Sequence, residues 1–199
     1  MAWAIVDLAS DAGLIEQATH LLLDVFRNRT DDWQDLDSAR QEVVASLAPD
    51  RISRVLIENS LVLGWVGGVP AYAGRVCEVH PLGVSRSHRR RGIGRALVED
   101  LERLAASRGA LTLWAGSDDE HDETTLSGAD LYPDIPGAIA NIRNLGGHPY
   151  EFYCRLGFKI AGVLPDANGQ GRPDIFLAKR IAQPPEEGPS TPDFNVVRG

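Results

Sequence analysis

A glycine-rich turn stands between two segments whose patterns predict regular structure. The turn reads Arg-Arg-Arg-Gly-Ile-Gly over residues 89–94, after the apolar stretch 76–84 and before the amphipathic stretch 93–107. This order predicts a strand, a tight turn and a helix. The first turn of a helix leaves backbone N–H groups unpaired, and the helix dipole adds partial positive charge there. With three arginines beside it, the turn is a candidate site for a diphosphate, and therefore for a nucleotide or a coenzyme.

Length and composition predict one globular domain. The chain has 199 residues, of which 43% are hydrophobic and 24% charged. We expect this domain to span residues 1–182, followed by a proline-rich, disordered tail at 183–199. No apolar run is long enough for a membrane span, and the N-terminus lacks the features of a signal peptide. Cys77 and Cys154 have no metal-binding spacing, so we expect no bound metal. Without a membrane span or a signal peptide, we expect a reduced, cytoplasmic protein with no membrane partner.

The negative charge of the chain is concentrated in one segment. The formal net charge is −8, yet no Lys or Arg occurs between Arg108 and Arg143. Such a segment is either a solvated loop or a surface that attracts a cationic substrate. Nucleic acid is disfavoured, because the only basic cluster is the short arginine run. The segment carries seven acids: Asp118, Asp119, Glu120, Asp122, Glu123, Asp130 and Asp134.

Strand and helix patterns mix along the chain, which predicts an α/β domain built around one sheet. Strands are expected at residues 4–8, 54–57, 61–69, 76–84, 110–115, 159–164 and 174–181. Helices are expected at 13–29, from a cap at 37–38 to about 47, and at 93–107, 135–145 and 149–156.

The turn fits the pattern Gln/Arg-x-x-Gly-x-Gly/Ala and resembles the coenzyme motif of the GNAT acyltransferase superfamily. The segment 152–158 is similar to the late Phe-Tyr-x-x-x-Gly-Phe segment of that superfamily. The resemblance implies a mostly antiparallel sheet with a splay between its two middle strands, flanked by helices. It also implies that the turn holds the pyrophosphate of acetyl-CoA and that acetyl transfer is direct, with no metal.

Further segments resemble the aminoglycoside 6'-N-acetyltransferases, most of all the branch that includes the chromosomal enterococcal enzyme. The agreement covers residues 74–181 and implies a cationic small-molecule substrate and a homodimer. The segments that carry it are 77–84 (Glu-x-His-Pro-Leu-x-Val), 116–120, 126–132, 148–153, 162–169 and 172–175.

Pro81 cannot donate a ladder hydrogen bond, so it marks a bulge or a splay in its strand. In the superfamily, the splay exposes backbone groups that hold the pantetheine arm and place an N–H on the thioester carbonyl, where it stabilises the oxyanion. The cofactor-binding residues implied are Leu82, Gly83, Val84, Arg89, Arg90, Arg91, Gly92, Ile93, Gly94, Arg95 and Tyr153.

Three residues are candidates for proton transfer. Glu78 and His80 alternate on one strand, so they share a face just before the splay. A carboxylate there can bind the substrate ammonium and accept its proton, directly or through water, or it can form a structural ion pair. His80 either transfers a proton or contacts substrate and neighbours. Tyr153 matches the superfamily tyrosine near the coenzyme sulfur, which protonates the thiolate or only contacts it.

The candidate substrate-binding residues are acidic or aromatic. Asp118 and Asp119 follow a strand beside the splay and are placed to bind ammonium groups. Trp33 and Tyr72 are expected either to stack on sugar rings or to pack. The leading hypothesis is an aminoglycoside 6'-N-acetyltransferase that confers resistance. The alternatives are an enzyme of this superfamily acting on another polyamine or on a protein lysine, and a coenzyme-binding module without catalysis.

Overall fold

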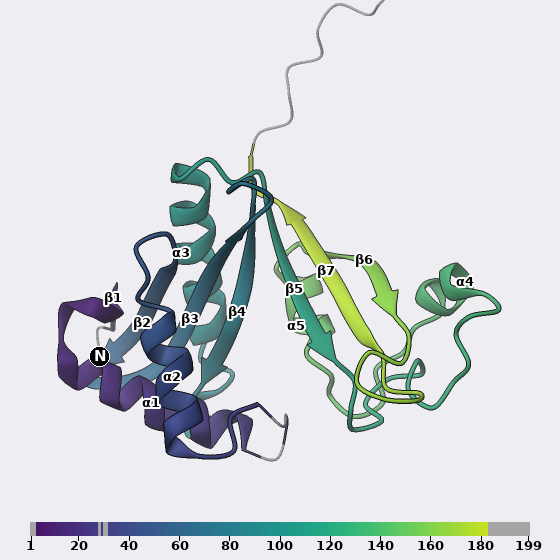
Figure 1. Ribbon diagram of the computed structural model, residues 1–199, viewed down its shortest axis with the longest axis horizontal. Helices are drawn as coiled ribbons and strands as arrows, with labels where there is room; N and C mark the ends of the chain where they lie inside the picture. The colour runs from purple at the N-terminus through teal and green to yellow at the C-terminus, as the bar shows by residue number, and fades with distance from the viewer. Residues whose placement is uncertain (1–2, 28, 30–31, 183–199) are drawn as a thin grey trace, which may run out of the picture.

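Seven strands form a single sheet in the order β1-β2-β3-β4-β5-β7-β6 (Figure 1). The computed structural model describes residues 3–27, 29 and 32–182. Neighbouring strands are antiparallel except β4 and β5, which are parallel. The expected α/β fold with a mostly antiparallel sheet is confirmed. The strands are β1 (Ala4–Asp7), β2 (Ile52–Glu58), β3 (Leu61–Ala71), β4 (Val76–Val84), β5 (Thr112–Asp118), β6 (Lys159–Leu164) and β7 (Asp174–Arg180).

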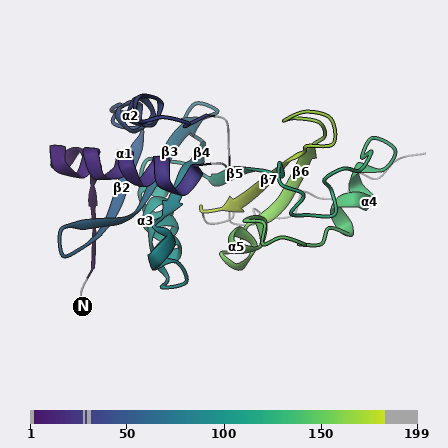
Figure 2. The ribbon, with the colours of Figure 1, turned by 90° about the horizontal axis from the view of Figure 1, so that it is seen from below.

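Helices cover both faces of one half of the sheet and one face of the other (Figures 1 and 2). A core between α1, α2 and strands β2 and β3 holds Trp65, which is fully buried. A second core joins α3 and α5 to the opposite face of the sheet. The helices are α1 (Ala12–Phe26), α2 (Leu36–Ala45), α3 (Ile93–Ser107), α4 (Ile135–Ala140) and α5 (Tyr150–Arg155), with 3-10 turns η1 (Leu8–Ser10) and η2 (Arg86–His88).

Several expected boundaries were wrong. Helix α2 starts at Leu36, earlier than expected, because its N-cap is Asp35 and not Asp37 or Ser38. Asp35 accepts a hydrogen bond from the backbone N–H of Ser38, and Ser38 Oγ accepts one from that of Asp35 in a capping box. The helix ends at Ala45. Helix α1 ends at Phe26. Helix α4 ends at Ala140, after which the chain turns, and the Asn141 amide donates to the Gly137 carbonyl.

Strand β5 continues to Asp118, three residues beyond its predicted end, because β7 pairs with its whole length. Trp114 is half-buried and packs edge-on against Phe176 at 5.7 Å between ring centroids. The predicted disordered tail lies outside the described residues. Within the described chain, no helix has the length and apolar character that a membrane crossing needs.

The splay between β4 and β5 opens where the sequence predicted it. These strands pair only from Val76–Glu78 to Thr112–Trp114, although both run further. On the other side of β4, the register with β3 shifts between Val66 and Gly68. Gly67 lies at this bulge, where any Cβ would collide with the His80 carbonyl oxygen. The bulge next to Pro81 thus redirects β4 away from β5.

Candidate active site

A cavity of about 190 Å³ lies in the splay and is lined by residues from both sides of this opening. One wall comes from α1, the loop after it and β4. The opposite wall comes from the end of β5 and from α5. Its lining residues are Phe26, Arg29, Asp32, Trp33, His80, Pro81, Leu82, Gly116, Ser117, Asp118, His121, Pro149 and Tyr153.

The glycine-rich turn forms an open helix N-terminus beside this cavity. Gly92 is the N-cap of α3, with a φ of 84° and no side-chain capping hydrogen bond. The first amides of α3, at Ile93, Gly94 and Arg95, are therefore available to an anion. Gly94 packs so closely on Phe152 that a Cβ would stand 3.1 Å from its ring. These donors and the adjacent arginines fit the diphosphate of a coenzyme.

The arginines of the turn differ in their surroundings. Arg91 pairs with Glu58 of β2 at 3.1 Å, and Arg95 lies 3.8 Å from Glu99 on the exposed face of α3. Burial lowers the pKa of Arg89, and the positive charges of Arg86 and Arg29 lower it further. An anion would relieve this repulsion at Arg89.

The backbone of residues 82–84 lies at the edge of the splay. Leu82, Gly83 and Val84 pair with β3, and on their other side no strand pairs with them in the described chain. Leu82 also lines the cavity. This arrangement leaves an edge of β4 free for main-chain hydrogen bonds to an extended ligand.

Glu78 and His80 share one face of β4, as predicted, but only His80 lines the cavity. The His80 ring lies 5.7 Å from the buried ring of Trp33. Glu78 is half-buried two residues before it. Burial raises the pKa of Glu78, while His80 and Arg51 oppose the shift. A carboxylate with a raised pKa is a stronger base than a solvated one.

Glu42 of α2 is a neighbour of these groups that the sequence analysis missed. Its Oε1 atom is buried without a hydrogen-bond partner. It lies 3.9 Å from both Nε2 of His80 and Nη1 of Arg51. Its charge adds to the rise in the pKa of Glu78. No sequence signal distinguishes Glu42 from a solvated helix residue, because only the packing of α2 on the sheet brings it to His80.

Tyr153 lies in α5 and is 8% exposed. Its ring packs between those of Phe152 and Phe158, with centroids at 5.2 and 5.3 Å. Burial raises the pKa of Tyr153, so its hydroxyl is protonated at neutral pH and can donate a hydrogen bond or a proton into the cavity that it lines.

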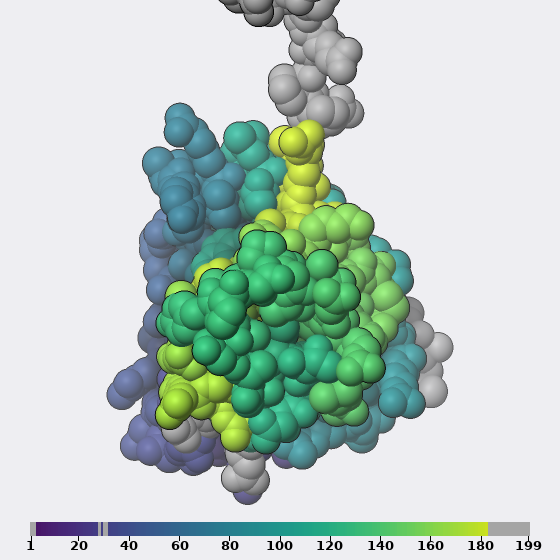
Figure 3. Space-filling view, turned by 90° about the vertical axis from the view of Figure 1, so that its right-hand side faces the viewer, coloured from purple at the N-terminus to yellow at the C-terminus, as the bar shows by residue number. Residues whose placement is uncertain are grey.

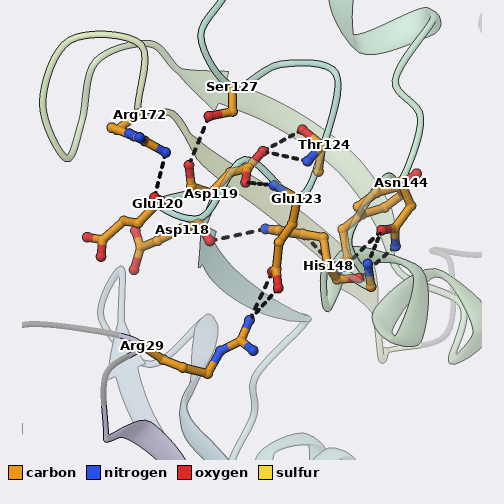
Figure 4. Close-up of polar contacts among 12 residues, drawn as sticks. Arg29, Asp118, Asp119, Glu120, Glu123, Thr124, Ser127, Asn144, His148 and Arg172 are labelled. Atoms are coloured by element: carbon orange, nitrogen blue, oxygen red, sulfur yellow. Dashed lines mark hydrogen bonds and ion pairs between the residues drawn. The ribbon is translucent and has the colours of Figure 1, made fainter.

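The two predicted substrate aspartates have different surroundings (Figure 4). Asp118 is exposed, lines the cavity and accepts a hydrogen bond from Asn168 Nδ2 at 2.8 Å. Asp119 is fully buried. Its carboxylate accepts hydrogen bonds from the backbone of Glu123 and from the backbone and hydroxyl of Thr124. Asp119 therefore shapes the loop, and its prediction as a substrate contact is corrected.

The two predicted aromatic contacts, Trp33 and Tyr72, also differ in their positions relative to the cavity. Trp33 is 7% exposed, lines the cavity and packs edge-on against Phe26 at 4.9 Å. Tyr72 is 79% exposed in the turn between β3 and β4 and is not among the described residues that line the cavity. This turn lies at the start of β4, whereas the splay lies near its end, so Tyr72 is removed from the candidate contacts.

The acidic segment is an ordered loop that carries less free charge than the sequence suggested. It lies on the β6 side of the molecule, where the green segment dominates the surface (Figure 3). Glu123 pairs with Arg29 at 2.9 Å and Asp122 with Arg172 at 3.0 Å. Asp134 caps α4. Much of this charge is thus paired or used in capping, and Asp118 is the acid of this segment that lines the cavity.

Comparisons with known proteins agree with this geometry. Residues 15–124 match the model of the Acetyltransferase (GNAT) family. An aminoglycoside 6'-N-acetyltransferase complexed with coenzyme A is 39% identical, with a TM-score of 0.86 over 94% of this chain and 100% of that chain. The aminoglycoside 6'-N-acetyltransferase from Enterococcus faecium is also 39% identical, with the same coverage and a TM-score of 0.84.

A third structure, of an aminoglycoside 6'-acetyltransferase type Ii, is 33% identical, with a TM-score of 0.71 over 93% of this chain and all of that one. No curated protein sequence matches the chain. Among the described residues, no group of three or more His, Cys, Asp or Glu side chains is arranged to hold a metal ion.

Proposed function

The chain belongs to the GNAT acetyltransferase family and is an acyl-CoA N-acetyltransferase that uses acetyl-CoA, and we propose that its acceptor is the 6'-amine of an aminoglycoside. The observation that carries this proposal is the cavity in the splay. One wall presents the Asp118 carboxylate and Tyr153, and the opposite wall presents His80. The choice of substrate is supported by the similar structures, which are those of aminoglycoside 6'-N-acetyltransferases and align with nearly the whole chain.

Each residue has a role in this proposal. Acetyl-CoA supplies the acetyl group as a thioester. The amides at the start of α3 and the neighbouring arginines bind its diphosphate. The free edge of β4 at residues 82–84 orients the acyl end and donates a hydrogen bond to its carbonyl. Asp118 binds an ammonium group of the acceptor, and Glu78 takes the proton of the reacting amine, directly or through water.

Tyr153 completes the site from the coenzyme side. In this proposal its protonated hydroxyl, in a side chain that lines the cavity, donates to the sulfur that leaves. A thiol has an ordinary pKa of about 8.5, so this donation is a modest contribution and the tyrosine also orients the coenzyme by contact.

The experiment that tests the acceptor uses neomycin and paromomycin, which differ in carrying an amine or a hydroxyl at the 6' position. Release of CoA is followed with a thiol reagent under steady-state conditions. We expect turnover with neomycin and little with paromomycin. Equal rates with both would overturn the 6' assignment. Faster turnover of a linear polyamine or of a lysine peptide than of neomycin would favour the alternative acceptors, and CoA binding without turnover of any amine would favour a non-catalytic module.

We also propose that the enzyme acts in the cytoplasm as a homodimer and confers aminoglycoside resistance. Cytoplasmic acetyl-CoA and the two free thiols of the described chain support the location.

The half-buried Trp114 and Phe176 support the dimer, because they lie on the face of β5 and β7 that no described helix covers (Figure 2). Light scattering should give twice the chain mass of 21.6 kDa, and Phe176→Lys should give the monomer. Expression in a sensitive bacterium tests resistance.

A further inference from the structure

His148 is a buried histidine just before α5, and 2% of its surface is exposed. Both of its ring nitrogens have partners. The backbone N–H of Tyr150 donates to Nδ1 over 3.1 Å, and Nε2 lies 3.1 Å from the carbonyl oxygen of Asp118 (Figure 4). A backbone N–H can only donate, so Nδ1 must be unprotonated. The ring hydrogen therefore sits on Nε2 and is donated to the Asp118 carbonyl.

This pattern requires a neutral imidazole. Burial lowers the pKa of His148, against the hydrogen bond to Asp118 and the charges of Asp119 and Glu123, while Arg29 lowers it further. Protonation would place a hydrogen on Nδ1 and remove the acceptor for the first amide of α5. The link between the two segments thus exists in the neutral form and is lost in the charged one.

The backbone of His148 is fixed independently of its ring. Asn144 Oδ1 accepts hydrogen bonds from the N–H groups of Gly147 and His148, both at 2.8 Å. Asn144 Nδ2 donates to the His148 carbonyl at 2.9 Å. With main chain and ring both held, the imidazole is a rigid connection between the elements that it touches.

Those elements together form one wall of the cavity, opposite the wall that includes β4. Asp118 ends β5 and is the proposed contact of the acceptor, and Tyr153 lies in α5 and is the proposed contact of the coenzyme. We propose that His148 is a positioning residue for acetyl transfer, which holds Asp118 and Tyr153 at the separation that the reaction needs. This role rests on the proposed function, since it presumes that the acceptor binds at Asp118 and the coenzyme at Tyr153. A displacement of about 1 Å between reacting groups costs up to about 100-fold in rate.

Two conservative variants separate the two ring contacts. In His148→Asn, the amide oxygen stands near Nδ1 and can accept from the α5 amide, but the side chain is too short to reach Asp118. In His148→Gln, the amide nitrogen stands near Nε2 and can still donate to Asp118. Because each variant keeps one contact and breaks the link, we expect kcat to fall about 10- to 100-fold in both, with the Kd for CoA unchanged. His20→Asn, at an exposed position on α1, is the matched control.

An unchanged kcat in either variant, or a loss of CoA binding in parallel with kcat, would overturn the proposal. Nitrogen NMR of the unmodified enzyme tests the ring itself, even if a variant does not fold. The expected result is the Nε2–H form at pH 7, titrating below the ordinary pKa of 6.5. A charged ring or the Nδ1–H form at pH 7 would also overturn it. The NMR measurement needs no acceptor, and the kinetics can use any amine that the enzyme acetylates, so failure of the aminoglycoside assignment is a separate outcome.

Discussion

Asp118 and Asp174 stand opposite each other in the antiparallel pair of β5 and β7, so two carboxylates lie side by side where β5 ends and β7 begins. The carboxylate of Asp174 turns back over Gly116 and accepts a hydrogen bond from the backbone N–H of Ser117 at 2.8 Å. Burial raises the pKa of Asp174 to about 6, and the charge of Asp118 contributes to the rise. The native fold therefore holds a carboxylate that ionises at a cost near neutral pH.

This cost predicts how stability depends on pH. A carboxyl with a raised folded-state pKa stabilises the fold below its unfolded value of 3.8, and the contribution is lost as pH rises through about 6. Asp174→Asn removes the charge and keeps an acceptor for Ser117. We expect the free energy of unfolding to rise by about 1 kcal/mol at pH 8, a value reduced for solvent screening, and to change little at pH 4. Urea unfolding at both pH values checks this, and an equal change at both would contradict it.

The glycine at the start of α3 allows a test with a built-in control. Gly92 and Gly109 flank the same helix and both have positive φ, 84° and 92°. Alanine at either position should cost about 1 kcal/mol of stability through backbone strain. Only Gly92→Ala also displaces the amides that face the coenzyme, so we expect it alone to raise the KM for acetyl-CoA, by about 10-fold. Steady-state kinetics and thermal unfolding of both variants separate strain from coenzyme binding.

The sequence predicted the frame of the site because the frame depends on local rules. The bounds of β4 and α3 were predicted without error, since both have strong periodicity and are bounded by turn residues. Pro81 located the splay because its missing N–H has a direct structural consequence. The start of α2 depends on which residue is its N-cap, and several neighbouring polar residues can take that position. The sequence alone therefore did not identify Asp35.

Side-chain environments were harder to predict because they depend on distant segments. Asp118 and Asp119 are adjacent acids, yet one faces the cavity and the other is buried under the loop. The loop brings the amides of Glu123 and Thr124 onto the Asp119 carboxylate, and Thr124 in turn pairs with Asn144 further along the chain. Glu42 lies near His80 only because of the packing of α2, and neither its residue type nor its spacing predicts this proximity.

The contrast between the adjacent aspartates predicts opposite effects of the same substitution. Asp118→Asn removes the charge that faces the acceptor, so we expect the acceptor KM to rise about 10-fold with stability nearly unchanged. The remaining kcat/KM should also depend less on ionic strength, since screened attraction is lost. Steady-state kinetics from low to high salt measure both effects.

Asp119→Asn should instead reduce stability. Its carboxylate accepts three hydrogen bonds in a buried site, and an amide replaces one acceptor oxygen with a donor that faces other donors. We expect a loss of about 1–3 kcal/mol in the free energy of unfolding, with the acceptor KM close to normal for the folded fraction. A raised acceptor KM at full stability would return Asp119 to the substrate contacts.

Glu78 is the proposed base, and its neighbours predict a pH profile. Burial and Glu42 raise its pKa, so kcat/KM should fall as pH drops through a value above the ordinary 4.5 of a glutamate. Glu78→Gln should lower kcat about 100-fold, remove that acid limb and leave the Kd for CoA unchanged. Glu42→Gln should move the limb to lower pH, because it removes a negative charge beside Glu78. Glu99→Gln, on the exposed face of α3, is the control. If the limb stays in Glu78→Gln, another group is the base, and His80 is the next candidate because it lines the cavity.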